Sequence, residues 1–357
     1  MYLRFRYYLL ICLSGLVFIS YGQQDCETSC AANCCSTDPT PAGVMISHLH
    51  TKKQFMLSYR YMSMQMGHMQ SGTQSVSDMQ VYNNYVMSSS GMRMDMHMLM
   101  GMYGLSNKIT LMGMLNYNYN TMSMTMLPTA HMTMPDGEIM GSVNAPSKIY
   151  SQGLGDTKLY ALYGIINNSK HHLLLSGGIS LPTGSITVQG SSTSMYQQRH
   201  VPYMMQMGTG TWDLMPGVTY LHSKGAITYS AQLSSIIHPG FNSMNYAYGN
   251  SATFTSWFAY KWFSLLSSSV RIDASTTGAI NGYDSNIPAG YEPSTLGQNY
   301  GGQHINGYIG TNFYFPKSSF MKNNRIMLEL GLPLYQNLNG VQQSTKSTLY
   351  ASWSAVF

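Results

Sequence analysis

The chain has 357 residues, of which 44% are hydrophobic and only 9% are charged, and its formal net charge is +5. Soluble globular proteins carry about 25% charged residues, and a membrane-spanning helix needs about 20 consecutive apolar residues. The mature chain has neither property and its mean hydropathy is −0.11, so helical membrane proteins, Rossmann folds and ordinary soluble enzymes fit poorly.

Residues 1–22 are predicted to be a cleaved secretory signal peptide. Arg4 and Arg6 precede an apolar stretch at 9–19, and small residues follow it at Ser20 and Gly22. Cleavage removes both arginines and leaves a formal charge of +3. That charge is small and scattered, so no nucleic-acid partner is expected.

Residues 23–52, which precede the first predicted strand, contain both cysteines and histidines. Its cysteines, spaced by four, four and one, are Cys26, Cys30, Cys34 and Cys35. An exported protein meets an oxidising compartment, so two disulfides are one interpretation. Steps of four would also place three thiols on one helical face for a soft metal. His48 and His50 follow as candidate ligands, and the segment is too short for a large plug domain.

Residues 53–357 show a two-residue period that is typical of β-strands. Phe55, Leu57, Tyr59 and Tyr61 alternate with polar residues in the first such segment. Similar segments follow at 91–104, 109–126, 156–167, 172–181, 211–222, 226–237, 253–263, 267–274, 304–315, 326–334 and 346–357. With the first segment there are twelve, and bacterial single-chain barrels have an even number of strands.

The connections between these segments alternate in length. Short polar turns occur at 104–108, 167–170 and 223–225, whereas long loops lie near 70–90, 127–155, 182–210, 238–252 and 275–303. Short periplasmic turns and long external loops characterise outer-membrane barrels. The sequence therefore predicts an all-β, antiparallel up-and-down transmembrane barrel of about 12 strands in a bacterial outer membrane. A secreted β-sandwich is the alternative, and it would not explain the asymmetry of the loops.

Methionine is concentrated in the first strands: 22 of the 31 methionines lie between 45 and 140. Most occupy even positions, and side chains at i, i+2 and i+4 share one face of a strand. The odd positions carry Leu and Tyr, as a lipid-facing surface does, so the methionines are expected to face the lumen. Arg93, Asp95 and His97 are odd too and would have to lie above the bilayer.

Thioether sulfur is a soft ligand that favours Cu(I), and imidazole also suits copper. The candidate metal ligands are Met62, Met64, Met66, His68, Met69, Met92, Met94, Met96, His97, Met98, Met100, Met102, Met112, Met114, Met122, Met124, Met126, His131, Met132 and Met134. Weak binding at many sites is what conduction along a pore requires. Methionine is also a plastic hydrophobic filler, so an apolar conduit and a purely structural lining are alternatives.

No catalytic motif stands out, because no G-x-S-x-G sequence follows a strand and precedes a helix. The chain is therefore interpreted as a non-enzyme with no certain cofactor, although copper(I) is a candidate ligand or substrate. The main hypothesis is a barrel that binds or conducts Cu(I) or Ag(I). The alternatives are a channel for small aromatic or hydrophobic compounds and a barrel that sequesters copper without conducting it. Outer-membrane lipid and the barrel-insertion machinery are the other expected partners.

Several stretches resemble a known bacterial family. These are Leu57–Met62, Met94–Met98, Gly155–Leu159, Ser180–Ser185 and Leu328–Gln336. They are similar to a Met-rich group of putative transporters assigned to the "MetA-pathway of phenol degradation" barrels, and the similarity extends over nearly the whole mature chain. The terminal strand ending in Phe357 resembles the insertion signal of such barrels. The Met and His content is also similar to copper-resistance outer-membrane proteins, which keep much of their Met in an N-terminal extension.

Overall fold

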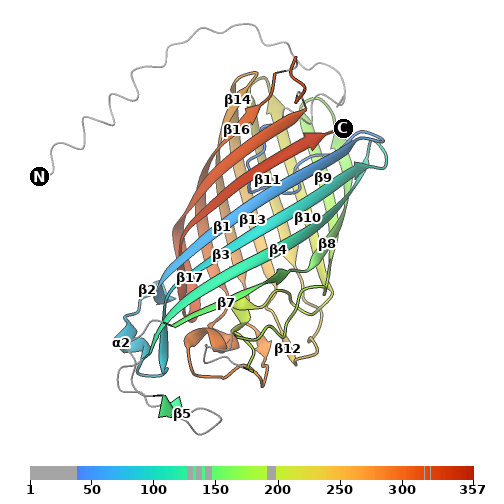
Figure 1. Cartoon of the computed structure of the whole chain (residues 1–357). Helices are drawn as coiled ribbons and strands as arrows, with labels where there is room; N and C mark the ends of the chain where they lie inside the picture. The colour runs from blue at the N-terminus through green and yellow to red at the C-terminus, as the bar shows by residue number, and fades with distance from the viewer. Residues whose placement is uncertain are drawn as a thin grey trace, which may run out of the picture.

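The computed structural model describes residues 38–126, 132–133, 139–140, 147–190, 198–316, 318–321 and 323–357. Their main feature is one closed antiparallel barrel, shown in Figure 1. Its strands are β1 (Phe55–Gly72), β3 (Met87–Gly104), β4 (Ile109–Met126), β8 (Thr157–Asn167), β9 (His171–Leu181), β10 (Asp213–Lys224), β11 (Ile227–Ile236), β13 (Ser251–Phe263), β14 (Leu266–Thr277), β16 (Gly302–Tyr314) and β17 (Asn324–Val356). The predicted fold class is confirmed.

The last strand, β17, crosses the barrel wall twice. Its first part pairs with β16 as far as Leu338, and its second part pairs with β1 from Val341 to Val356. The backbone N–H of Val356 donates to the carbonyl of Asn323 at 3.2 Å, so the two parts lie against each other. Gly340, with φ +61°, lies in the reversal between them, where a residue without Cβ is unstrained. The eleven named strands therefore make the twelve crossings that the sequence predicts.

Alternation along each strand separates an apolar outside from a lumenal inside. On β17 the inward Met327 and Glu329 are buried. The outward residues, which are exposed, are Ile326, Leu328, Leu330, Leu332 and Leu334. An apolar belt of this kind suits lipid, and barrel closure leaves no unpaired strand edge to face it.

The long connections gather at one end of the barrel and the short turns at the other. Figure 1 shows the C-terminus at the short-turn end and α2 and β12 at the long-loop end. The remaining elements are β2 (Gln74–Ser75), α2 (Asp78–Val81), β5 (Met132–Thr133), β6 (Ile139–Met140), β7 (Ser147–Leu154), η2 (Tyr203–Met205), β12 (Tyr246–Ala247), β15 (Asn281–Gly282), η3 (Pro293–Thr295) and η4 (Gly297–Asn299). β7 extends the wall beyond β8 by pairing with the outer half of β4. No helix in the described ranges has the length and apolar character to cross a membrane.

Leu330→Arg is expected to destabilise the barrel in lipid by roughly 2–4 kcal/mol, because it places a charge in the middle of the apolar belt. The matched control is Gln65→Arg, since Gln65 is exposed on the outer face opposite the charged Arg93 rather than among apolar residues, and its substitution should cost only about 0–1 kcal/mol. Denaturant unfolding in lipid vesicles measures both. Equal costs for the two variants would contradict a lipid-facing belt.

Candidate functional site

The methionines of β1, β3 and β4 face the lumen. On β3, Met98, Met100 and Met102 are at most 5% exposed, whereas Leu99 and Tyr103, at odd positions, are 47% and 43% exposed. The same alternation continues on β4, where Met112 and Met114 are buried and Leu111 and Leu115 are exposed. We call the inward methionines of these three strands the methionine wall. Its lumenal orientation, expected from the parity of the sequence, is confirmed.

Strand register brings the thioethers together in rows. Met102 pairs with Met56 on β1 and with Met112 on β4. Met92 likewise pairs with Met66 on one side and Met122 on the other. Three further rows contain only two methionines each, namely Met62 with Met96, Met64 with Met94, and Met100 with Met114. Because adjacent strands lie about 4.8 Å apart, flexible thioether side chains in one row can reach a common point.

A β-bulge changes the parity of β1 near its external end. The register with β17 shifts between Met66 and Met69. An inserted residue reverses which side of the sheet the following residues face. Met69 is therefore buried at 3% exposure although its position is odd, and His68 is exposed. Met69 joins the buried side chains as predicted, but the expectation that His68 joins them is corrected.

His97 lies outside the barrel, on the face opposite to its neighbouring methionines. Its Nδ1 lies 2.7 Å from the hydroxyl of Tyr59. Tyr61 donates to Asp95 at 2.7 Å, and Arg93 forms an ion pair with the same carboxylate at 2.8 Å. His97 is therefore removed from the lumenal ligand set, because strict alternation places it on the outer surface.

Some predicted ligands cannot be placed. Cys26, Cys30, Cys34, Cys35, His131 and Met134 lie outside the described residues, as does the predicted signal peptide. Met132 belongs to β5, whose side chains are also outside the description. Within the described ranges, no three His, Cys, Asp or Glu side chains form a metal-binding group.

Residues 38–54, here called the N-terminal segment, run through the lumen near the short-turn end. The amide of Gly43 donates to Glu329 on β17 at 2.6 Å. On the other side of the lumen, the carbonyl of Ile46 accepts from Gln232 at 2.7 Å. The amide of His50 donates to Thr110 on β4 at 2.9 Å. A sequence too short for a plug domain thus still fills this end of the barrel.

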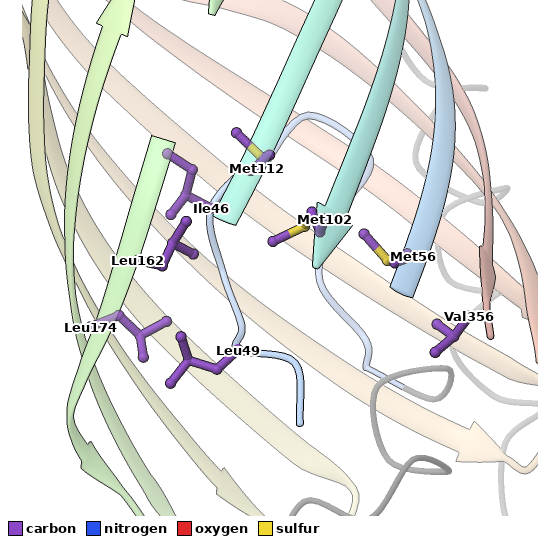
Figure 2. Packing of buried hydrophobic residues seen from close by; sticks show 8 residues of the cluster. All are labelled: Ile46, Leu49, Met56, Met102, Met112, Leu162, Leu174 and Val356. Atoms are coloured by element: carbon purple, nitrogen blue, oxygen red, sulfur yellow. The ribbon is translucent and has the colours of Figure 1, made fainter. Parts of the chain in front are cut away.

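Hydrophobic contacts complete the attachment of the N-terminal segment. Figure 2 shows Ile46 and Leu49 among side chains that point inward from the barrel wall. The cluster consists of Ile46, Leu49, Met56, Met102, Met112, Leu162, Leu174 and Val356. Met45 packs against this cluster and also against the one formed by Met98, Met100 and Met114. The segment therefore covers the part of the methionine wall that lies toward the short-turn end of the barrel.

Buried charges hold the N-terminal segment in register. Glu329 accepts from the guanidinium of Arg271 at 2.8 Å while it accepts from Gly43. Arg60 donates to the carbonyl of Val44 at 2.8 Å. A carboxylate oxygen of Asp38 lies 3.1 Å from Nδ1 of His48 and 3.9 Å from the guanidinium of Arg325. Burial alone would raise the pKa of Asp38, but the hydrogen bond from His48, the charge of Arg325 and the hydrogen bond from Thr40 hold that pKa well below its ordinary value.

External loops cover the other half of the methionine wall. Val201 and Met205, in and beside η2, are fully buried against Met87, Met92 and Met122. The loop that contains Tyr203 is connected to the long loop at 275–303 by the hydrogen-bonded pair of His200 and Asp284, whose Nδ1 and carboxylate oxygen are 2.6 Å apart. This loop therefore packs apolar side chains against the methionines at the long-loop end.

Between the two coverings, a middle stretch of the methionine wall is only partly buried. It consists of Met62, Met64, Met94 and Met96. Tyr308 and Tyr350, on β16 and β17, form another part of the barrel and flank Arg271, whose guanidinium lies 3.6 Å from the ring centroid of Tyr308. The side chains of this middle stretch are uncharged thioethers. Arg271 is paired with the carboxylates of Glu329 and Asp273.

Several methionines that face or contact the lumen were not among the predicted metal ligands. Met56 shares the even parity of the other methionines and could have been included. Met45 lies in the N-terminal segment, and Met204 and Met205 lie in an external loop. These three residues pack against the methionine wall only through tertiary folding, so neither the periodicity nor the spacing of the sequence predicts them.

Comparison with known proteins supports the fold. An outer membrane channel from Pseudomonas putida F1 has a TM-score of 0.55 at 13% identity, over 87% of this chain and 97% of that chain. Weaker likenesses include the KdgM porin (TM-score 0.39, 9% identity, 85% and 99% coverage) and the CymD monoaromatic hydrocarbon channel (0.38, 8%, 86% and 89%). No protein-family model and no curated protein matches the sequence. The chain therefore shares its barrel fold with the Pseudomonas putida protein.

Glu329→Gln is expected to loosen the N-terminal segment, because it removes the buried charge that Arg271 and Gly43 both contact. Breaking a buried ion pair from one side costs roughly 3–5 kcal/mol. Protease cleavage within residues 38–54 should become faster, and denaturant unfolding should show a lower stability. Asp273→Asn is the control, since Asp273 also pairs with Arg271 but makes no contact with Gly43. Cleavage that is accelerated equally in both variants would refute the proposed attachment.

Proposed function

We propose that the protein is an outer-membrane channel for small aromatic or other hydrophobic solutes. The observation that carries this proposal is the uncharged inward face of β3 and β4. From Met92 to Met102 each inward residue of β3 is methionine, and the inward residues of β4 from Thr110 to Met126 are Thr, Met and Asn. These two strands present no charge to the lumen, so this part of the lining does not hold ions by Coulomb attraction, and the methionines of β3 offer little hydrogen bonding to sugars.

Methionine is well suited to weak contact with aromatic rings. A thioether sulfur beside a ring contributes about 0.3–1.5 kcal/mol, and the unbranched side chain adapts to different shapes. The partly exposed Met62, Met64, Met94 and Met96 would form successive contacts of this kind. Weak contacts in series let a solute enter and leave, which tight binding at a single point would prevent.

Passage through the lumen requires the coverings at both ends to move. The N-terminal segment closes the short-turn end, and the loop around η2 closes the external end. Each is attached by a limited set of hydrogen bonds and small apolar clusters rather than by strands of the barrel. Segments attached in this way open at lower free energy than the barrel wall itself. The proposed channel is therefore gated.

The proposed location is the bacterial outer membrane, after export through the predicted signal peptide. The outer belt would contact lipid, and the terminal strand that ends in Phe357 would be read by the barrel-insertion machinery. The proposal assigns the chain to channels rather than enzymes.

Met94→Asp combined with Met96→Asp should slow uptake of a small aromatic compound at least tenfold, because two carboxylates would replace thioethers in the partly buried middle stretch of the methionine wall. Uptake is measured in cells whose own outer-membrane channels have been deleted, since phospholipid liposomes already admit hydrophobic compounds. Met94→Leu combined with Met96→Leu is the matched control and should retain uptake. Equal uptake by all three proteins, or faster uptake of a sugar of the same size than of the aromatic, would exclude the proposal.

A second candidate function is binding of Cu(I) or Ag(I) by the methionine wall. The observation in its favour is the register that aligns Met56, Met102 and Met112 in one row and Met66, Met92 and Met122 in another. Three thioethers from adjacent strands can converge on one soft cation, and their affinity does not depend on protonation. This function needs neither conduction nor movement of the N-terminal segment.

Replacement of Met92, Met94, Met96, Met98, Met100 and Met102 by Leu tests this second candidate. The expected result is a lower number of Cu(I) ions bound per chain in competition with a chromophoric chelator, while the barrel remains folded because Met and Leu have similar volumes. Far-ultraviolet circular dichroism checks the fold. An unchanged Cu(I) capacity would remove the soft-metal function and leave the hydrophobic channel unaffected.

A further inference from the structure

A small cavity lies where the N-terminal segment meets the methionine wall. Its volume is about 20 Å³, and its lining includes His48, Met45, Met56, Met100, Met102 and Met327. A cavity needs about 10–15 Å³ to hold one water molecule, so this one has room for a single small occupant. Its lining comes from the N-terminal segment and from β1, β3 and β17. The chain thus builds a largely enclosed site from segments that are far apart in sequence.

His48 presents one unused nitrogen in this region. Its Nδ1 lies 3.1 Å from a carboxylate oxygen of Asp38 and 2.9 Å from the hydroxyl of Ser47. With Nδ1–H donating to Asp38, the lone pair of the neutral ring is on Nε2. Nε2 is buried and has no hydrogen-bond partner among the described residues. A carboxylate that orients the far nitrogen of an imidazole is the usual outer contact of a metal-bound histidine.

The other lining groups are soft and uncharged. Met56, Met100, Met102 and Met327 are all at most 5% exposed, and Met45 completes the set from the N-terminal segment. An imidazole nitrogen together with several thioethers selects Cu(I) and related soft ions over Mg, Ca or Mn. A buried nitrogen without a partner is costly, and a metal ion would remove that cost.

Charge in the surroundings disfavours a divalent ion more than a monovalent one. Arg60 and Arg325 also line the cavity, and their repulsion of a doubly charged cation is twice that of a singly charged one. Both guanidiniums are engaged elsewhere: Arg60 donates to the carbonyl of Val44, and Arg325 pairs with Asp38 and donates to Ser354. They would therefore not compete with an ion for the sulfur atoms or for Nε2 of His48.

We infer that the cavity binds one Cu(I) or Ag(I) ion, held by His48 Nε2 and by thioethers from the set Met45, Met56, Met100, Met102 and Met327. The inference goes beyond the proposed channel function and does not depend on conduction; it assigns to the second candidate function, soft-cation binding, one specific site that includes a histidine outside the methionine wall. An ion in this position would join the N-terminal segment to β1, β3 and β17. It would thereby strengthen closure at the short-turn end of the barrel.

The experiment is an Ag(I) and Cu(I) titration of the full-length, refolded protein after its thiols have been alkylated. His48→Gln should weaken the tightest site at least tenfold, and X-ray absorption of bound Cu(I) should lose its nitrogen ligand while sulfur ligands remain. Met100→Leu combined with Met102→Leu should weaken the same site and should preserve the packing volume. Protease cleavage within residues 38–54 should slow on addition of Ag(I) in the native protein but not in His48→Gln.

Two variants serve as matched controls. His172→Asn changes an imidazole on β9 that is hydrogen-bonded to Asn167, and Met215→Leu changes a buried thioether on β10 that accepts from Tyr160. Neither residue lines the cavity, so the tightest site should remain intact in both. Unchanged affinity in His48→Gln, or a loss that is equally large in His172→Asn, would overturn the inference. Uptake of aromatic solutes in metal-free buffer is measured separately, so failure of this site and failure of the channel function are distinguishable.

Discussion

Closure of the sheet by pairing β1 with the second part of β17 determines how the rest of the molecule is arranged. The register runs from Met56 with Val356 to Ser71 with Val341, and it joins the first strand to the last. Once the sheet is closed, each strand has one face toward the lumen and one toward the surroundings. Because lipid provides no hydrogen-bond partner, the apolar face is directed outward and the backbone is paired around the ring. The methionine wall follows from this constraint together with a two-residue period.

The interior is not a simple open pore. Side chains of the N-terminal segment and of the external loops occupy the two ends, and the same methionines that line the lumen supply the apolar surface against which they pack. Methionine suits both tasks because its unbranched, polarisable side chain fills irregular contacts yet exchanges them at low cost. The buried charges have a different role. Arg60, Arg271 and Glu329 fix the path of the N-terminal segment through hydrogen bonds that an apolar wall could not provide.

Much of the barrel could be predicted from alternation, because each strand is a local pattern of residues i and i+2. The segments 109–126 and 156–167 correspond closely to β4 and β8, and the inward direction of Met112 and Met114 followed from their parity alone. The site was predicted less completely. His97 was grouped with the methionines by adjacency although its parity was opposite, and the bulge after Met66 reversed the direction of His68 and Met69 in a way that no local pattern reveals. Met45 joins the wall only because its segment folds back into the lumen.

The sequence by itself determined the strand pattern, the asymmetry of the connections and the uncharged, sulfur-rich face of β3, since these depend on residues close together in the chain. Only the tertiary structure decided that residues 38–54 enter the barrel and that His48, which precedes the first strand, lies at a cavity with Met327 from near the other end of the chain. Such contacts depend on how a closed wall and an irregular segment pack together. Neither has a repeating signature, because the energy of each contact depends on partners that are hundreds of residues apart.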